Sequence, residues 1–140
     1  MNGHPWASLI TVDRILDLHR ESISRYGGDR TPSPKDGCLE KSLGAAWNAE
    51  LYAETGDGIP GLCFAGCLFF YLAKNHCFVD GNKRISWMSA MQVLLGLHLT
   101  VDVSEEDAEA YCLSILSGDV AKATDASIWL ADHLISVEEE

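Results

Sequence analysis

Apolar side chains recur at three- and four-residue steps along most of this chain, which is the spacing of amphipathic α-helices. The first such segment covers residues 12–26. It lies between Thr11, which we expect to cap it, and Gly27 and Gly28, which supply a stop. Residues 39–47 predict a short second helix. No segment has a clear two-residue alternation, so the pattern gives no reason to expect strands here.

Two later segments predict the centre of the domain. Residues 62–75 are apolar on nearly every face, which a helix tolerates only with neighbours all around it. Residues 82–97 predict a second central helix. We expect its inward stripe to consist of the following residues: Ile85, Met88, Met91, Leu94 and Leu95.

The last third of the chain predicts two more helices. Ser104 precedes three acidic residues, an N-cap followed by carboxylates that the helix dipole stabilises, and Gly118 ends this helix. Thr124 is the expected cap of the final helix. Residues 1–140 are therefore predicted to form a single all-α domain of about six helices around two central ones, with at most a small flap hairpin at residues 54–61.

Composition narrows the classes of function. The chain has 140 residues, and its 10 Lys and Arg against 21 Asp and Glu give a formal net charge of −11. A field of this sign repels phosphate backbones and anionic lipids, so we expect no nucleic-acid or membrane partner. The longest uncharged apolar run, residues 62–73, is shorter than the roughly 20 residues of a membrane span. The N-terminal residues lack the features of a secretory signal, so we expect a cytoplasmic protein.

The five cysteines are an odd number and include no Cys-x-x-Cys pair. This argues against both a disulfide framework and a zinc site. Cys63 and Cys67 lie four residues apart on an apolar helix, and both are expected to be small core residues.

One short string, HCFVDGNKR at residues 76–84, joins the two predicted central helices. The backbone N–H groups at the start of the second helix can bind an anion, and Gly81 has no Cβ to keep one away. The cations of Lys83 and Arg84 add to these N–H groups and to the helix dipole. Together they predict a site for polyphosphate, built locally within an acidic protein.

Three further side chains of the string suggest what this site does. Asp80 is the carboxylate of the turn and would ligate Mg²⁺ on the phosphates of a nucleotide. His76 ends the preceding helix, where an imidazole can take a proton from an attacking hydroxyl. Phe78 is expected to point into the core and anchor the loop. These are the parts of a phosphoryl or nucleotidyl transfer site.

Each of these residues also has a simpler explanation. Asp-Gly is a common turn, Lys-Arg is often a solvated helix face, and a single histidine is often a hydrogen-bonded structural residue. The chain also lacks the G-x-x-x-x-G-K-[ST] phosphate loop.

The string HCFVDGNKR resembles the signature H-P-F-x-[DE]-G-N-[GK]-R of the Fic/Doc superfamily. It is closest to the death-on-curing (Doc) form, H-x-F-x-[DN]-[AG]-N-K-R. Other segments are similar to Doc proteins in the same order: VDRILDLHRESISRYGG, GCLEKSLGAAW, the apolar helix before the motif, and SEEDAEAYCLSILSGD. The resemblance covers about residues 10–135 and implies a compact helical Fic/Doc fold.

The resemblance also assigns roles to the motif. It implies that His76 is the base that activates a hydroxyl of the target, and that Asp80 holds Mg²⁺ on the phosphates of ATP. The phosphates themselves would be bound at the following positions: Gly81, Asn82, Lys83 and Arg84.

Two departures from the AMP-transferring Fic pattern bear on the reaction. Lys83 replaces the second glycine of G-N-G-R, and Trp87 replaces a second arginine three residues after Arg84. A lysine fills space and adds charge, while loss of the distal arginine removes a clamp on the far phosphates. In Doc-like proteins with this lysine, the resemblance implies that ATP is reversed, so that its γ-phosphoryl faces the attacking hydroxyl.

The implied activity is phosphorylation of a Ser or Thr in a protein. The resemblance points to elongation factor Tu as the target and translation arrest as the result, which describes the toxin of a toxin–antitoxin pair. Two alternatives stay open, a Fic-type adenylyltransferase and a catalytically silent binding module.

Three other features complete these expectations. Cys77 stands where the Fic pattern has proline, which would place a thiol beside the base. No segment matches the inhibitory helix [ST]-x-x-x-E-[GN] of many Fic proteins. The resemblance then implies a separate Phd-like antitoxin, whose disordered tail folds into an apolar groove of the toxin. Residues 55–61 are a candidate flap for docking a target segment.

Overall fold

The structure, a computed structural model, describes residues 4–28, 33–53 and 58–136. Within these residues it is helical apart from one pair of short strands, so the all-α prediction is confirmed. The helices are a 3₁₀ helix η1 (Pro5–Ser8), then α1 (Val12–Tyr26), α2 (Cys38–Leu51), α3 (Leu62–Asn75), α4 (Asn82–Gly96), α5 (Glu105–Ser117) and α6 (Ala123–Asp132). The strands are β1 (Leu99–Val101) and β2 (Leu134–Ser136).

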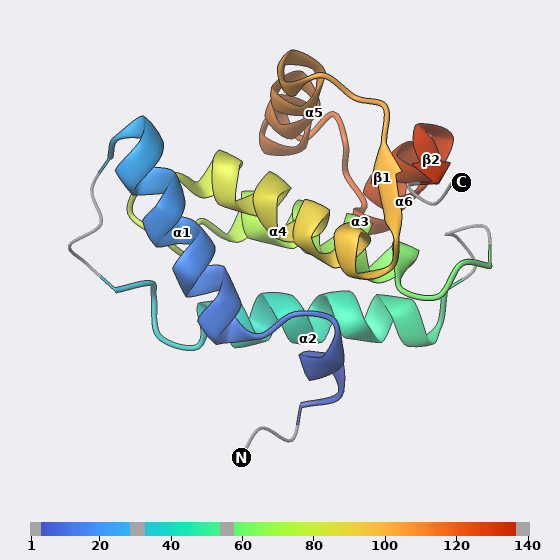
Figure 1. Ribbon diagram of the computed structural model, residues 1–140, viewed down its shortest axis with the longest axis horizontal. Coiled ribbons are helices and arrows are strands. Elements are labelled where there is room, and N and C mark those ends of the chain that lie inside the picture. The colour runs from blue at the N-terminus through green and yellow to red at the C-terminus, as the bar shows by residue number, and fades with distance from the viewer. Residues whose placement is uncertain (1–3, 29–32, 54–57, 137–140) are drawn as a thin grey trace.

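Helix α3 is the centre of the molecule. It packs along α2, α4 and α6, and Figure 1 shows α2 and α5 on opposite sides of the α3 and α4 pair. Residues 62–70 of α3 are all buried, as the apolar sequence predicts. Gly66 allows α6 to come close, because a Cβ at this position would lie only 2.3 Å from the Cα of Ser127. Any larger residue at Gly66 would push α6 away.

Local capping explains where several helices begin and end. Thr11 accepts a hydrogen bond from the Arg14 N–H at the start of α1, and Gly27 follows its end. Ser104 accepts one from the Asp107 N–H at the start of α5, and Gly118 ends that helix in the left-handed conformation. These predicted caps are confirmed.

The start of α3 is capped differently, by a side chain from another helix. Glu50 of α2 accepts hydrogen bonds from the N–H of Gly61 and from the N–H of Phe64, both at 2.9 Å. The carboxylate also stabilises the positive end of the α3 dipole. Glu50 lies 11 residues before Gly61 in the chain, so the local sequence does not indicate this cap.

Helix α4 corrects the predicted inward stripe. The residues that face the core include Ile85, Leu94 and the small residues Ser86, Ser89 and Ala90. Leu95 was wrongly placed inside and is 61 % exposed. The small side chains leave room for neighbouring helices on this face, whereas Met88, Met91 and Leu95 lie on the side of α4 toward α1 and α5.

Two further expectations need correction. Helix α6 begins one residue before Thr124, with Lys122 as a cap residue that makes no side-chain hydrogen bond. The strands lie elsewhere than the predicted hairpin: β1 pairs antiparallel with β2, with Thr100 opposite Ile135. This pairing joins the end of α4 to the end of α6. The flap at residues 55–61 lies largely outside the described residues, and residues 58–61 contain no strand.

No helix in the described ranges combines the length and the apolar character needed to cross a membrane.

Candidate active site

The motif loop, residues 76–81, connects α3 to α4. His76 is the residue after α3 and has a left-handed backbone, with φ of 50°. Its side chain is exposed, and Nδ1 lies 3.3 Å from the Lys74 carbonyl oxygen. Because a carbonyl only accepts hydrogen bonds, Nδ1 must carry the proton in this contact. The lone pair is then on Nε2, which leaves that nitrogen able to act as a base.

The middle of the loop is fixed by contacts with its own residues. The Asn82 side chain accepts from the Phe78 N–H at 3.0 Å and donates to the Phe78 carbonyl at 2.7 Å. Asn82 is buried, and Phe78 is 5 % exposed and belongs to the core. The Asn82 side chain therefore holds the loop together, and its contribution to anion binding comes from its backbone N–H.

His19 of α1 contacts the same loop from the core side. His19 is buried, and its ring stacks on Phe78 with centroids 3.8 Å apart and planes 10° apart. Its Nε2 lies 2.9 Å from the Asp80 carbonyl oxygen, so Nε2 donates the proton. The sequence places His19 only within the predicted helix of residues 12–26, because its contact with the loop depends on how α1 packs.

The first turn of α4 is open to an anion. Gly81 precedes it with φ of 81°, a conformation that glycine adopts readily. Its own N–H donates to Asp80 Oδ1 at 2.9 Å. In the described part of the chain, the N–H groups of Asn82, Lys83 and Arg84 have no hydrogen-bond acceptor, as expected for a first helical turn without a cap. They are available to bind phosphate oxygens.

The two cations of this turn are held in different ways. Lys83 Nζ lies 3.4 Å from Glu109 Oε2 of α5, and both side chains are solvent-accessible. The Arg84 guanidinium lies over the ring of Tyr26, with Cζ 4.2 Å from the centroid. Cation–π contact keeps Arg84 extended at the edge of the site.

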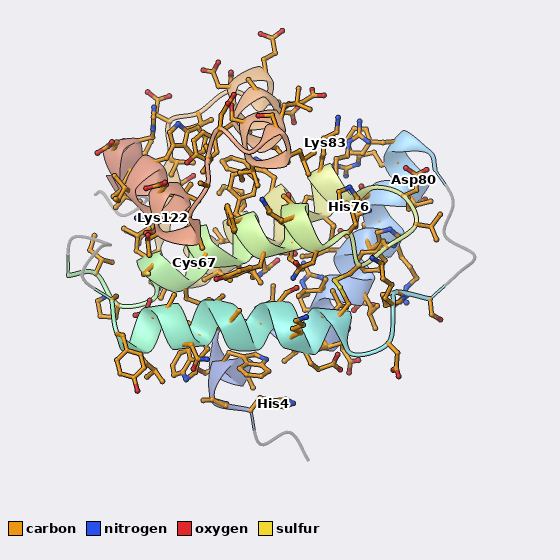
Figure 2. All side chains as sticks on the ribbon, turned by 180° about the vertical axis from the view of Figure 1, so that it is seen from behind. His4, Cys67, His76, Asp80, Lys83 and Lys122 are labelled. Carbon is orange, nitrogen blue, oxygen red and sulfur yellow. A yellow bond between two sulfur atoms is a disulfide. The ribbon has the colours of Figure 1, made fainter. Side chains whose placement is uncertain are left out.

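These groups share one cleft of about 860 Å³ between α1, the motif loop, α4 and α5. One end holds the motif, and Figure 2 shows His76, Asp80 and Lys83 together on this side of the molecule. The other end is apolar and is lined by the following residues: Trp87, Met88, Met91, Leu95, Leu113 and Leu116. Trp87 stands where the AMP-transferring Fic pattern has an arginine. It packs against the rings of Phe69 and Trp129, with centroids 5.3 and 6.1 Å apart.

The residues of the cleft fit Mg²⁺ only together with phosphates. Asp80 is exposed, lines the cleft and has one carboxylate oxygen on the Gly81 N–H. In the described ranges no three His, Cys, Asp or Glu side chains form a group that could hold a metal. A single carboxylate completed by phosphate oxygens and water is a common arrangement for Mg²⁺ at nucleotide sites.

The cysteines correct two expectations. Cys77 forms a disulfide with Cys38, the first residue of α2, with Cα atoms 5.5 Å apart. The expectation that the chain forms no disulfide was wrong, and so was the expectation of a free thiol beside His76. An odd number of cysteines is compatible with one pair and three free thiols. Cys63 and Cys67 are buried and form no disulfide, so their predicted place in the core is confirmed.

Comparison with known proteins assigns the family. A model of the Fic/DOC family matches residues 9–94, more than half of the chain. The chain belongs to the Fic/DOC family. Proteins of the Fic/DOC family transfer nucleotide-derived groups to proteins and use ATP as a substrate. The match includes α1 to α3, the whole motif loop and α4 up to residue 94. Among curated proteins, none matches the chain significantly.

Proposed function

We propose that this Fic/DOC protein is a Doc-like kinase, the toxin of a toxin–antitoxin pair, which transfers the γ-phosphoryl group of ATP to a Ser or Thr of a protein. The observation that carries this proposal is the pair of residues around the phosphate site. Lys83 occupies the position of the second Fic glycine, and Trp87 occupies that of the second arginine.

The surroundings of Trp87 change the character of the cleft wall as well as the residue at this position. Its ring is part of an aromatic cluster with Phe69 and Trp129, so this wall of the cleft is apolar where a second cation would bind far phosphates. The cations and the free N–H groups are instead concentrated at the loop end of the cleft, beside His76. This distribution favours binding the terminal phosphates next to the base.

The mechanism follows from the positions of these groups. Nε2 of His76 takes the proton of the target hydroxyl. The hydroxyl oxygen forms a bond to the γ-phosphorus while the bond between that phosphorus and the β,γ-bridging oxygen breaks, and ADP leaves with the electron pair. The N–H groups of Asn82, Lys83 and Arg84, with the two cations, stabilise the charge on the phosphate oxygens.

Asp80 would hold Mg²⁺ on the nucleotide phosphates, where the ion neutralises part of their charge and aligns them. Asp80 itself is positioned by the contact of its carbonyl with His19.

The proposed partners are a protein substrate and an antitoxin. We take elongation factor Tu as the first substrate to test, because Doc proteins resemble this chain most closely in the motif. The apolar end of the cleft suits the folded tail of a Phd-like antitoxin, since Leu95, Leu113 and Leu116 are exposed there. A helix presenting apolar residues at three- and four-residue spacing could cover this surface.

Position-specific labelling of ATP tests the reaction. The protein is incubated with elongation factor Tu and ATP labelled at either the α- or the γ-phosphorus. Transfer of the γ label alone, with the mass of one phosphoryl group, is the expected result. Transfer of the α label would identify an adenylyltransferase, and no transfer to any protein of a cell extract would favour a silent binding module.

Lys83→Gly sharpens the same test, because it restores the Fic residue at this position. We expect the variant to lose γ transfer and to gain α transfer. The control Lys122→Gly removes a lysine that is exposed at the start of α6, away from the cleft. Unchanged chemistry in Lys83→Gly would remove the reason for choosing phosphoryl transfer.

A further inference from the structure

The motif loop is tied to α2 next to the proposed base. The Cys38–Cys77 disulfide joins the first residue of α2 to the residue that follows His76, across 39 positions of sequence. Cys77 is 2 % exposed, whereas Cys38 is half-buried. Cys38 is therefore the more accessible residue of the bridge.

Hydrogen bonds accompany the disulfide on both sides of His76. The Lys35 N–H donates to the Cys77 carbonyl at 2.8 Å. Before His76, the Asn75 side chain donates to the Ser42 hydroxyl at 2.9 Å. The residues on either side of His76 are thus docked on one segment, which contains the start of α2.

His76 needs this support because of its backbone. Its φ of 50° is a conformation that residues other than glycine seldom adopt, and such conformations persist where the surroundings hold them. The disulfide is the covalent part of that support. Without it, the loop can relax toward negative φ and carry the imidazole away from the phosphate site.

The three cysteines outside the disulfide are poorly placed to react with a thiol or an oxidant from solution. Cys63, Cys67 and Cys112 are buried and form no disulfide. The hydrogen bond between the Cys67 and Cys63 sulfurs and burial raise the pKa of the Cys67 thiol, and burial raises the pKa of the Cys112 thiol. Thiols react as thiolates, so these two are held in the unreactive form.

We propose that the Cys38–Cys77 pair is a reversible redox site that controls the proposed transferase, with the disulfide form active and the dithiol form slow. This inference rests on the proposed function for its effect on catalysis. Its effect on the loop stands without that function. The bridge includes the residue that follows His76, so a change in the bridge would act on the base directly.

The reductant is a low-molecular-weight thiol. Its thiolate attacks the Cys38 sulfur, the bond between the two protein sulfurs breaks, and Cys77 leaves as a thiolate that takes up a proton. A second thiolate attacks the mixed disulfide and releases the Cys38 thiol. Two small thiols become one small disulfide, and the protein disulfide becomes two thiols. The reverse exchange, with the small disulfide as oxidant, restores the bridge.

The test compares the intact protein in its oxidised and reduced forms. Each form is prepared with glutathione in the matching redox state, and alkylation followed by mass measurement counts its free thiols. Hydrogen exchange then reports the loop amides directly. We expect the amides of residues 77–81 to exchange at least about tenfold faster in the reduced form, and γ-phosphoryl transfer to fall roughly tenfold, because small displacements of a base are costly.

Two variants provide the controls. Cys38→Ser removes the bridge without changing the motif, so it should remain at the slow level and ignore the redox state. Cys63→Ala removes a buried thiol that is outside the disulfide and contacts the Ala49 carbonyl, and this variant should respond as the native chain does. Equal loop exchange in the two forms of the native chain would overturn the proposal, as would a redox response in Cys38→Ser.

The outcomes separate this inference from the proposed function. If neither form transfers a group to any protein while the exchange difference remains, the function fails and the redox control of the loop stands. If transfer occurs at equal rates in both forms, the function stands and the redox control fails.

Discussion

Helices α3 and α4 begin in the same way but receive different partners. Each follows a glycine in the left-handed conformation, with φ of 89° at Gly61 and 81° at Gly81. Neither glycine can cap the helix with a side chain. At α3 the protein supplies its own anion, because Glu50 accepts the N–H of Gly61 and that of Phe64. Two N–H groups at the start of α3 are thereby satisfied within the fold.

At α4 the first turn contains Lys83 and Arg84, and in the residues that the structure describes its free N–H groups have no acceptor. Cations at the positive end of a helix dipole are unfavourable. An anion bound from solution would offset this unfavourable positive charge and would also accept hydrogen bonds from the N–H groups. The comparison shows how one helix start can serve stability and the next can serve binding, with the difference made by a single carboxylate from a neighbouring helix.

The largest effect that separates the two helix starts should come from removing His76, the proposed base beside the start of α4. His76→Ala should lower transfer about 10²- to 10⁴-fold, because general bases contribute factors of this size. The free energy of unfolding should change little, since the imidazole is exposed. Rates are measured with γ-labelled ATP, and unfolding is followed by circular dichroism.

His98 offers a matched control for that experiment. It is also exposed and has a left-handed backbone, with φ of 62°, but it follows α4 rather than α3. His98→Ala should keep full activity. A fully active His76→Ala protein would show that His76 is not the base.

Removal of the Glu50 cap of α3 should lower stability and leave the transfer rate unchanged, the opposite of the effect of His76→Ala. Glu50→Ala removes two charge-assisted hydrogen bonds and leaves two N–H groups without their partner. We expect the free energy of unfolding to fall by about 2–4 kcal/mol, with the transfer rate per folded molecule unchanged. Urea unfolding measures the loss. Glu40→Ala, at an exposed position of the same helix, should cost less than about 1 kcal/mol. A similar cost at both positions would show that the carboxylate is not a specific cap.

This contrast explains how much could be predicted from the sequence. Helix positions follow from local patterns, so α1, α3 and α5 were placed correctly by their caps, glycines and apolar spacing. The motif string was visible as a concentration of glycine, histidine and cations between two helices. Local chemistry was sufficient wherever the determining residues are neighbours in the chain.

The missed features all depend on packing. Glu50 reaches the start of the next helix, His19 meets the loop 61 residues later, and Cys38 meets Cys77 across 39 residues. The spacing of one helix gives no information about which of these pairs meet. Leu95 was misplaced for the same reason, because small serine and alanine side chains mark the inward face of α4 and apolar ones line the cleft.

A third prediction concerns the support of the open site from α1. His19→Phe keeps an aromatic ring for stacking on Phe78 but loses the hydrogen bond to the Asp80 carbonyl. Transfer should fall about tenfold through kcat, because the first turn of α4 and Asp80 would shift together. The free energy of unfolding should fall by only about 1 kcal/mol, the usual net value of one hydrogen bond.

His19→Gln separates positioning from packing. It can donate an N–H to the same carbonyl but cannot stack, so it should recover part of kcat while being less stable than His19→Phe. If kcat in both variants simply followed stability, His19 would be a core residue and nothing more.

The smallest effect should come from Glu109, the carboxylate that lies beside Lys83 at the start of α4. Glu109 lies 3.4 Å from Lys83, and both side chains are largely solvated, so the pair contributes little to stability. Glu109→Gln frees Lys83 for phosphate and should tighten ATP binding about two- to threefold, a gain of well under 1 kcal/mol. Calorimetric titration with ATP measures this change in affinity.

Glu105→Gln is the control, because it changes the net charge equally. Glu105 also lines the cleft, yet nothing in the described structure pairs it with Lys83. Tighter binding in both variants would mean that the general field of the cleft, rather than this pair, competes with the phosphates. Tighter binding in Glu109→Gln alone would mean that the Glu109 carboxylate weakly occupies the start of α4, as the Glu50 carboxylate occupies the start of α3.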